Sequence, residues 1–375
     1  MKRSLKKFLV AALCLGIIGA PLVIEAAPSD ASTAATGKIK AEKLKLEKKW
    51  DKVFPKSDVV NHRKVTFVNR YGITLAADLY EPKNYSGKLA AIAVCGAFGA
   101  VKEQSSGLYA QTMAERGFLT IAFDPSFTGE SGGYPRFVAS PDINTEDFCA
   151  AVDFLSVQPN VDENRIGIIG ICGWGGMAIN AAAVDTRIKA TATMTMYDMS
   201  RVMANGYFDS GKPAQAVAAE RRANREKLNA QRTADYKAGI YSRAGGVVED
   251  PSNMPQFVQD YYEYYKTARG YHKRSLNSNA GWNTTTALSF MNMPLLSYAT
   301  EIRTPVLIVH GEKAHSRYFS EDAFKYMTGK KPSGMYTIHG NKELLIIPSA
   351  NHIDLYDNLN AIPFDRLEQF FKTNL

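Results

Sequence analysis

Cys172 is the residue whose surroundings most clearly predict chemistry. It lies within residues 170–176, Gly-Ile-Cys-Gly-Trp-Gly-Gly, between a short apolar β-branched run and an Ala-rich segment. The run predicts a buried strand and the Ala-rich segment a helix, so the cysteine falls on the turn between them. Glycines on both sides let strand and helix pack closely around a strained residue. The helix N-terminus would direct free N–H groups at the sulfur and favour the thiolate, so we predict a nucleophilic cysteine.

A cysteine nucleophile needs a base, and the base needs a partner that orients it. The candidate base is His352, on a predicted loop after the last predicted strand, 344–347. Its place after the nucleophile and the acid in the chain favours a catalytic role over that of an ordinary surface histidine. The candidate acid is Glu312, which follows the predicted strand 306–309. Asp198 is the alternative, because it follows the preceding strand and parallel strands end at the same edge of a sheet.

Two backbone N–H groups are expected to hold an oxyanion beside the nucleophile. Gly173, directly after the cysteine, would supply one of them. The turn after the predicted strand 90–94 would supply the other, from Ala97 or from Phe98.

The surrounding elements predict how these residues are positioned. Strands are expected at 64–69, 73–81, 90–94, 118–123, 188–196, 306–309 and 344–347, and helices at 106–116, 145–158 and 364–372. Alternating strands and helices predict an α/β fold whose mostly parallel central sheet is covered by helices on both faces. We assign residues 62–197 and 302–375 to this core. Residues 198–301, inserted after the sixth core strand, are helical and then tyrosine-rich, and we predict a helical lid over the site.

The N-terminal residues predict export. Residues 1–27 combine a basic start, an apolar run over 8–24 and small residues at a plausible cleavage site, which is typical of a signal peptide. We therefore expect a secreted or periplasmic, cell-envelope protein, with an uncleaved anchor as the alternative. Residues 28–61 are expected to be a linker with a charged amphipathic helix at 38–54. No later segment is apolar enough to span a bilayer, so no stable membrane insertion is expected after cleavage.

Composition narrows the function classes. The net charge of +8 is spread over the signal and one lysine-rich segment, which gives no support to nucleic-acid binding. Beyond the signal the chain keeps Cys95, Cys149 and Cys172, an odd number that predicts a free thiol rather than a disulfide framework. The six histidines have no paired metal spacing, so neither a metal nor another cofactor is expected.

The motifs resemble the α/β-hydrolase superfamily and, within it, the dienelactone hydrolase-like family. Residues 170–176 match that family's G-x-C-x-G-G elbow, residues 97–99 resemble its oxyanion turn, and the likeness covers 62–375 without the insertion. The resemblance implies a hydrolase that cleaves a carboxylic ester, lactone or thioester through an acyl-cysteine intermediate. It implies a small-molecule ester-type substrate and no cofactor. Two positions depart from the family, which has a glutamate where this chain has Gly96 and its triad acid where this chain has Ala314.

The departure at Ala314 motivates a different class of function. A degenerate, non-catalytic relative could bind a ligand or sense redox state through Cys172. An acyltransferase or a peptidase could also use the same machinery. The intact elbow and His352 favour the hydrolase.

Overall fold

The computed structural model describes residues 37–375. One compact unit runs from Lys40 to Leu375, and the other, Met1–Ile39, lies almost wholly outside the described residues. The predicted signal peptide, 1–27, is among the residues that are not described. Within 37–375, no helix has the length and apolar character needed to cross a bilayer.

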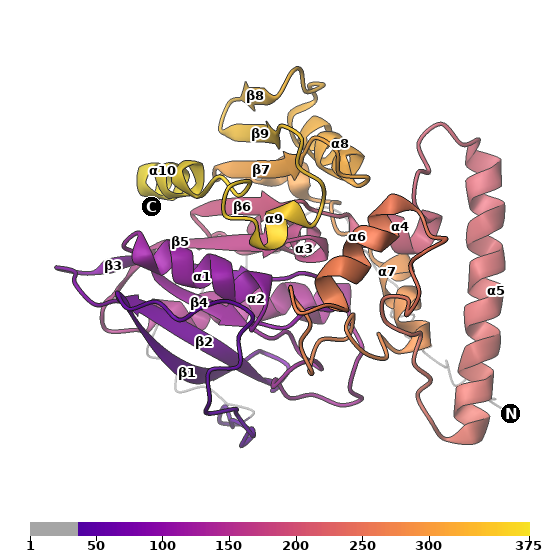
Figure 1. Ribbon diagram of the computed structural model, residues 1–375, viewed down its shortest axis with the longest axis horizontal. Coiled ribbons are helices and arrows are strands. Elements are labelled where there is room, and N and C mark those ends of the chain that lie inside the picture. Colours follow the sequence, from indigo (N-terminus) through magenta and orange to yellow (C-terminus); the bar gives the residue numbers. More distant parts are fainter. Residues whose placement is uncertain (1–36) are drawn as a thin grey trace, which may run out of the picture. The chain divides into compact units, whose positions relative to one another are not determined.

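A single sheet forms the centre of the Lys40–Leu375 unit (Figure 1). Within the described residues it has nine strands, in the spatial order β1-β2-β4-β3-β5-β6-β7-β9-β8. The neighbours from β4 to β9 pair in parallel, whereas β1, β2 and β8 pair antiparallel at the two edges. The bounds are β1 (Val60–Val68), β2 (Thr74–Pro82), β3 (Leu89–Cys95), β4 (Leu119–Phe123), β5 (Val161–Ile171), β6 (Ala190–Met194), β7 (Val306–Gly311), β8 (Tyr336–His339) and β9 (Lys342–Ile347). This confirms the predicted α/β-hydrolase fold class.

Helices cover both faces of the sheet. On one face lie α1 (Ser105–Glu115) and α10 (Phe364–Asn374), which contact each other, and α1 crosses in front of the sheet in Figure 1. On the other face lie α2 (Pro141–Ser156), α3 (Gly173–Val184) and α8 (Arg317–Thr328). The central strands β3, β4, β6 and β7 are therefore buried along their whole length, as their continuous apolar sequences predict.

The helices and strands of the core are interrupted between β6 and β7 by an insertion whose regular elements are helices. It contains α4 (Met199–Asn205), α5 (Ala214–Ala238), α6 (Gln256–Tyr265) and α7 (Ala287–Asn292), with short 3-10 turns at Thr284–Thr286 and Ala299–Glu301. Only Val217 and Asp235 of α5 are buried, so this long helix is almost entirely exposed. The other helices of the insertion contribute buried side chains, and α4 and α6 bear on the candidate site.

The amphipathic helix predicted at 38–54 is absent from the structure, and this prediction is wrong. The segment runs without regular secondary structure along the core. Its backbone N–H groups bond to core residues far away in sequence: Glu42 donates to Thr74 Oγ1 at 2.7 Å and Val53 to the carbonyl of Glu103 at 3.0 Å. These bonds satisfy the backbone that a helix would otherwise have to satisfy internally.

Candidate active site

The turn that carries Cys172 has the strained geometry expected of a nucleophile elbow. Cys172 lies between the end of β5 and the start of α3, with φ 57° and ψ −126°. Non-glycine residues rarely adopt a positive φ, and such strain clusters at functional sites. A Cβ at Gly173 would lie 2.7 Å from both Met199 Sδ and Phe98 Cβ, and one at Gly175 would lie 2.4 Å from Met196 Cβ. Glycine at these positions therefore lets the turn pack against its neighbours.

Three neighbouring groups lower the pKa of the Cys172 thiol by hydrogen bonding. They are the backbone N–H groups of Phe98 and Gly173 and the hydroxyl of Tyr356. Burial outweighs them and raises this pKa overall, since the side chain is only 6% exposed. The thiolate that we expected at the helix N-terminus is therefore not the resting form. Of the backbone N–H groups considered as oxyanion donors, those of Gly173 and Phe98 act on the thiol, and that of Ala97 does not.

The insertion braces the turn that carries Phe98. Asn277 Nδ2 donates to the carbonyl of Phe98 at 2.8 Å. The carbonyl of Gly99 accepts from the N–H of Leu276 at 2.8 Å and from Ser275 Oγ at 2.9 Å. The position of one oxyanion donor thus depends on residues that are distant in sequence.

His352 is buried, with 1% exposure, on the loop after β9. Its Nε2 lies 3.1 Å from the hydroxyl of Tyr356, the same hydroxyl that faces Cys172. Its Nδ1 lies 2.6 Å from Ser316 Oγ and 2.8 Å from Thr195 Oγ1. Tyr356 therefore lies between Cys172 and His352, and the hydroxyls of Ser316 and Thr195 contact the other nitrogen of the imidazole.

The structure does not bring either predicted acid to His352. Glu312 accepts the backbone N–H of Ser349 at 2.9 Å. Asp198 caps α4, where it accepts the N–H of Arg201 at 3.0 Å. Within residues 37–375, no carboxylate makes a hydrogen bond with the imidazole of His352.

A buried chain of hydroxyls and imidazoles lies behind His352. Ser316 Oγ also contacts His310 Nε2 at 2.9 Å, and His310 Nδ1 contacts Ser320 Oγ at 2.6 Å. Burial lowers the pKa of His310 to about 3 and that of His352 well below its usual value, with further lowering by neighbouring histidines. Both rings are therefore neutral. One consistent set of hydrogen bonds has His352 Nδ1–H donating to Ser316 Oγ, Ser316 donating to His310 Nε2, and His310 Nδ1–H donating to Ser320 Oγ.

The sulfur opens into a cavity of about 320 Å³ between the core and the insertion. Phe98, Tyr197 and Tyr356 line it from the core. Most of its remaining wall comes from the insertion, with Met199, Val202, Met203, Tyr207, Val247, Tyr261, Tyr265, Asn277 and Trp282. No Asp, Glu, Lys, Arg or His is among its lining residues within the described chain. The cavity is at the small end of the range for ligand sites, about 300–1,000 Å³, and suits an uncharged group.

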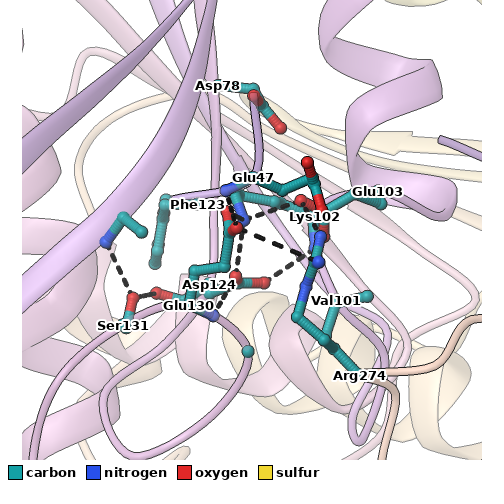
Figure 2. Close-up of polar contacts among 12 residues, drawn as sticks. Glu47, Asp78, Val101, Lys102, Glu103, Phe123, Asp124, Glu130, Ser131 and Arg274 are labelled. Carbon is teal, nitrogen blue, oxygen red and sulfur yellow. Dashed lines mark hydrogen bonds and ion pairs between the residues drawn. The ribbon is translucent and has the colours of Figure 1, made fainter. Parts of the chain in front are cut away.

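A buried ion network lies beside the turn that carries Phe98. Figure 2 shows Lys102 at its centre, with its Nζ 2.8 Å from Glu103, 2.7 Å from Asp124 and 2.7 Å from Glu130. Arg274 of the insertion reaches Glu103 at 2.8 Å. These pairs tie the insertion to the core a few residues from the oxyanion turn. Burying charges costs free energy unless they are paired, so each member depends on the others.

Sequence reasoning missed several residues that meet in space at this site. Tyr356 follows His352 by four residues, and this spacing is the only local signal that could have drawn attention to it. Ser316 lies two residues after Ala314, where the family resemblance places the acid. Thr195 and His310 have no spacing signal.

Comparisons with known proteins bear on the fold and the family. The chain is 55% identical over its full 375 residues to the uncharacterized protein PA2218 of Pseudomonas aeruginosa, 96% of which is covered. The crystal structure of PA2218 has a TM-score of 0.82 and 58% identity, with coverage of 89% of this chain and 100% of that one. The α/β hydrolase GrgF from Penicillium sp. sh18 has a TM-score of 0.65 at 20% identity, covering 84% and 99%, which supports the fold alone.

A shorter stretch of the chain is similar in sequence to a protein whose name describes an enzymatic activity. Thiohydrolase aneE of Aspergillus aculeatus is 37% identical over 99 residues, which cover 26% of this chain and 31% of that protein. The family model of X-Pro dipeptidyl-peptidase (S15 family) matches residues 71–352. This chain is a hydrolase of the α/β fold and belongs to the S15 family.

Proposed function

We propose that this protein cleaves a thioester, carboxylic ester or lactone through an acyl-cysteine intermediate on Cys172. One observation carries the proposal: the buried sulfur is faced by the N–H groups of Phe98 and Gly173 and opens into an uncharged cavity. Two backbone donors beside a nucleophile are what an oxyanion requires. No cofactor takes part in the proposed reaction.

Acylation begins from the neutral thiol. Cys172 Sγ forms a bond to the substrate carbonyl carbon while its proton passes to Tyr356 Oη, and the Tyr356 proton passes to His352 Nε2. The carbonyl oxygen becomes an oxyanion held by Phe98 and Gly173. The bond to the leaving group then breaks, the carbonyl re-forms, and the leaving group takes the proton from His352.

Deacylation transfers the acyl group from Cys172 to water. Water attacks the acyl carbon and gives a proton to His352, the oxyanion forms again, and the bond to Cys172 breaks. The sulfur recovers its proton through Tyr356. The acid is released, and the thiol and the neutral imidazole are restored.

The electrostatics favour thioesters and esters over amides. The pKa of Cys172 is raised and that of His352 is lowered, so a thiolate–imidazolium pair is unfavourable here. Attack by Cys172 forms the imidazolium transiently with every substrate. An amine must take its proton before it leaves, so the unfavourable imidazolium has to persist until that transfer, whereas a thiolate can leave first and take the proton afterwards. The partial likeness to a thiohydrolase supports the same choice.

Two further features complete the proposal. The insertion acts as a lid, because it supplies most of the wall that separates the sulfur from solvent. The protein works outside the cytoplasm after export by its N-terminal segment, as the basic and apolar pattern of residues 1–27 supports.

A dipeptidyl-peptidase activity is the second candidate, because the matching family carries that name. Such an enzyme must bind the free ammonium group of a peptide. A carboxylate in the binding site would pair with it, and the described lining of the cavity includes none.

Redox sensing by Cys172 fits less well than hydrolysis. Cysteines that sense redox state have lowered pKa values and are accessible, whereas Cys172 is buried and its pKa is raised.

A burst experiment tests the proposal. The protein is mixed with p-nitrophenyl hexanoate and with Gly-Pro p-nitroanilide, and product release is followed by stopped flow. We expect a burst equal to the enzyme concentration with the ester only. It should be lost in Cys172→Ala and kept in Cys149→Ala, because Cys149 is partly buried on α2 outside the cavity. Turnover of the dipeptide substrate without an ester burst would favour the peptidase, and no product from either substrate would favour a non-catalytic protein.

A further inference from the structure

Residues 47–54, which we call the strap, reach the insertion beside the oxyanion turn. The strap is fastened to the core at two points. Lys52 Nζ pairs with Asp78 at 3.0 Å, and both side chains are fully buried. The backbone N–H of Val53 donates to the carbonyl of Glu103 at 3.0 Å. A chain segment held in this way keeps one position on the core.

Arg274 of the insertion contacts both the strap and the core. Its Nη2 lies 2.8 Å from Asp51 Oδ2 of the strap and 2.8 Å from Glu103 Oε1 of the core. Figure 2 shows Arg274 among the charged residues of the network around Lys102. Burial alone would raise the pKa of Glu103, but Lys102 and Arg274 hold this pKa well below its usual value, so the carboxylate is ionised at neutral pH. Carboxylates on two separate segments therefore fix Arg274.

The loop of residues 275–277 holds the oxyanion turn. Ser275 Oγ donates to the carbonyl of Gly99 at 2.9 Å, and Asn277 Nδ2 donates to the carbonyl of Phe98 at 2.8 Å. A Cβ on Gly99 would collide with Asn277 Oδ1, so the loop packs directly on the turn. Gly99 has φ 85°, and glycine restrains the backbone less than any other residue. The contacts with the loop therefore decide which conformation the turn adopts.

The two oxyanion donors are held in different ways. Gly173 belongs to the first turn of α3, and the helix itself fixes its N–H. Phe98 lies on a turn whose carbonyls are held by the loop, and Arg274 directly precedes that loop. A misplacement of about 1 Å can cost about a hundredfold in rate. Whatever holds the loop in place therefore sets the strength of the second donor.

We propose that Arg274 is a positioning residue for the oxyanion donor Phe98, and that the strap contributes through Asp51. This inference rests on the proposed acyl-cysteine function. Neither Arg274 nor Asp51 lines the cavity, so both act through the loop rather than on the substrate. Arg274 keeps the loop against the oxyanion turn, and Asp51 keeps Arg274 in place. The strap is then a working part of the active site.

Single-turnover acylation by p-nitrophenyl hexanoate tests the role of Arg274. Stopped-flow rates over a range of substrate concentrations separate the maximal acylation rate from the apparent Kd. Removal of one oxyanion donor costs about 10²–10³-fold, so a displaced donor in Arg274→Met should lower the maximal rate by about ten- to a hundredfold. The apparent Kd should stay within about twofold, because only transition-state binding is weakened. An unchanged maximal rate, or a loss in Kd alone, would overturn the inference.

The variants are chosen so that the fold persists. In Arg274→Met, Glu103 keeps its pair with Lys102 at 2.8 Å. Arg274→Lys keeps a cation at this place and should have a rate between those of Arg274→Met and the wild type. Asp322→Ala is the matched control, because Asp322 also pairs with an arginine of the insertion, Arg201, at 2.7 Å, but this pair joins α4 to α8. It should acylate at the wild-type rate.

A double-mutant cycle tests the path from the strap. Asp51→Ala removes one of the two partners of Arg274 and should slow acylation by about three- to tenfold, the effect of one hydrogen bond. In the Arg274→Met background the same change should have no further effect, because Asp51 acts through Arg274. Additive losses would contradict this path.

Hydrogen–deuterium exchange separates this inference from the proposed function. In Arg274→Met, peptides that cover residues 96–104 and 274–281 should exchange about tenfold faster, whereas α3 keeps its wild-type rate. If the wild type is acylated on Cys172 but neither the acylation rate nor the exchange responds to Arg274→Met, the inference fails and the proposed function stands. If no substrate acylates Cys172 but the exchange responds, the proposed function fails and the link from Arg274 to the turn stands.

Discussion

Replacement of Tyr356 by phenylalanine isolates the hydroxyl that connects nucleophile and base. In the structure this hydroxyl lies 3.1 Å from His352 Nε2 and faces Cys172 Sγ. If it passes the thiol proton to the imidazole, its removal takes away general-base assistance, which contributes about 10²–10⁴-fold to a rate. A hydroxyl that only packs the site would cost one neutral hydrogen bond, or about tenfold.

The assay is the acylation rate, measured by stopped flow with p-nitrophenyl hexanoate at pH 7. We expect a fall of at least a hundredfold in Tyr356→Phe, with a loss in the free energy of unfolding of about 1 kcal/mol. Tyr264→Phe is the matched control, because Tyr264 is also fully buried and packs on Tyr356 at 5.1 Å without lining the cavity. It should acylate at the wild-type rate. A fall of less than about tenfold in Tyr356→Phe would refute the relay.

Four other predictions follow from the charges and bonds around the site. Because the pKa of His352 is well below 6.5 and that of Cys172 is raised above 9.0, kcat/KM should be flat from about pH 6.5 to 8. The rate at which iodoacetamide alkylates Cys172 should keep rising with pH up to at least about pH 9. A plateau of this rate near neutrality would contradict a neutral resting thiol. Ser316→Ala should slow acylation about five- to tenfold by removing the 2.6 Å contact to His352 Nδ1, and an unchanged rate would show that this hydroxyl does not orient the ring. Lys102→Met should lower the free energy of unfolding in urea by about 3–5 kcal/mol, because it leaves the buried Asp124 without a cation and removes one of the cations that pair with Glu103 and Glu130, and a loss below about 1 kcal/mol would argue against a tightly coupled network.

The parts of the site that could be predicted are those with a local signature. The elbow is recognisable because close packing requires glycine at fixed offsets from Cys172, and the strands because both faces of β3, β4, β6 and β7 are buried. His352 follows from its position after the last parallel strand. Each of these signals lies within a few residues along the chain.

The rest depends on contacts between distant segments. Glu312 has the chain position expected of a triad acid, but its carboxylate bonds to the backbone of Ser349, and nothing local predicts this choice. Ser316 and Thr195 reach His352 from different loops, and hydroxyl residues are too common for their spacing to be informative. Lys102 is typical of a surface residue in sequence yet is fully buried, because its partners come from separate segments.

The central claim is covalent catalysis by Cys172, and intact-protein mass spectrometry tests it most directly. The protein is mixed with hexanoyl N-acetylcysteamine thioester, quenched in acid within one turnover, and digested to locate the adduct. The account predicts one hexanoyl group per chain, on Cys172, that disappears as hexanoic acid accumulates. Hexanoic acid formed at the same rate by Cys172→Ala, or an adduct confined to another residue, would contradict it.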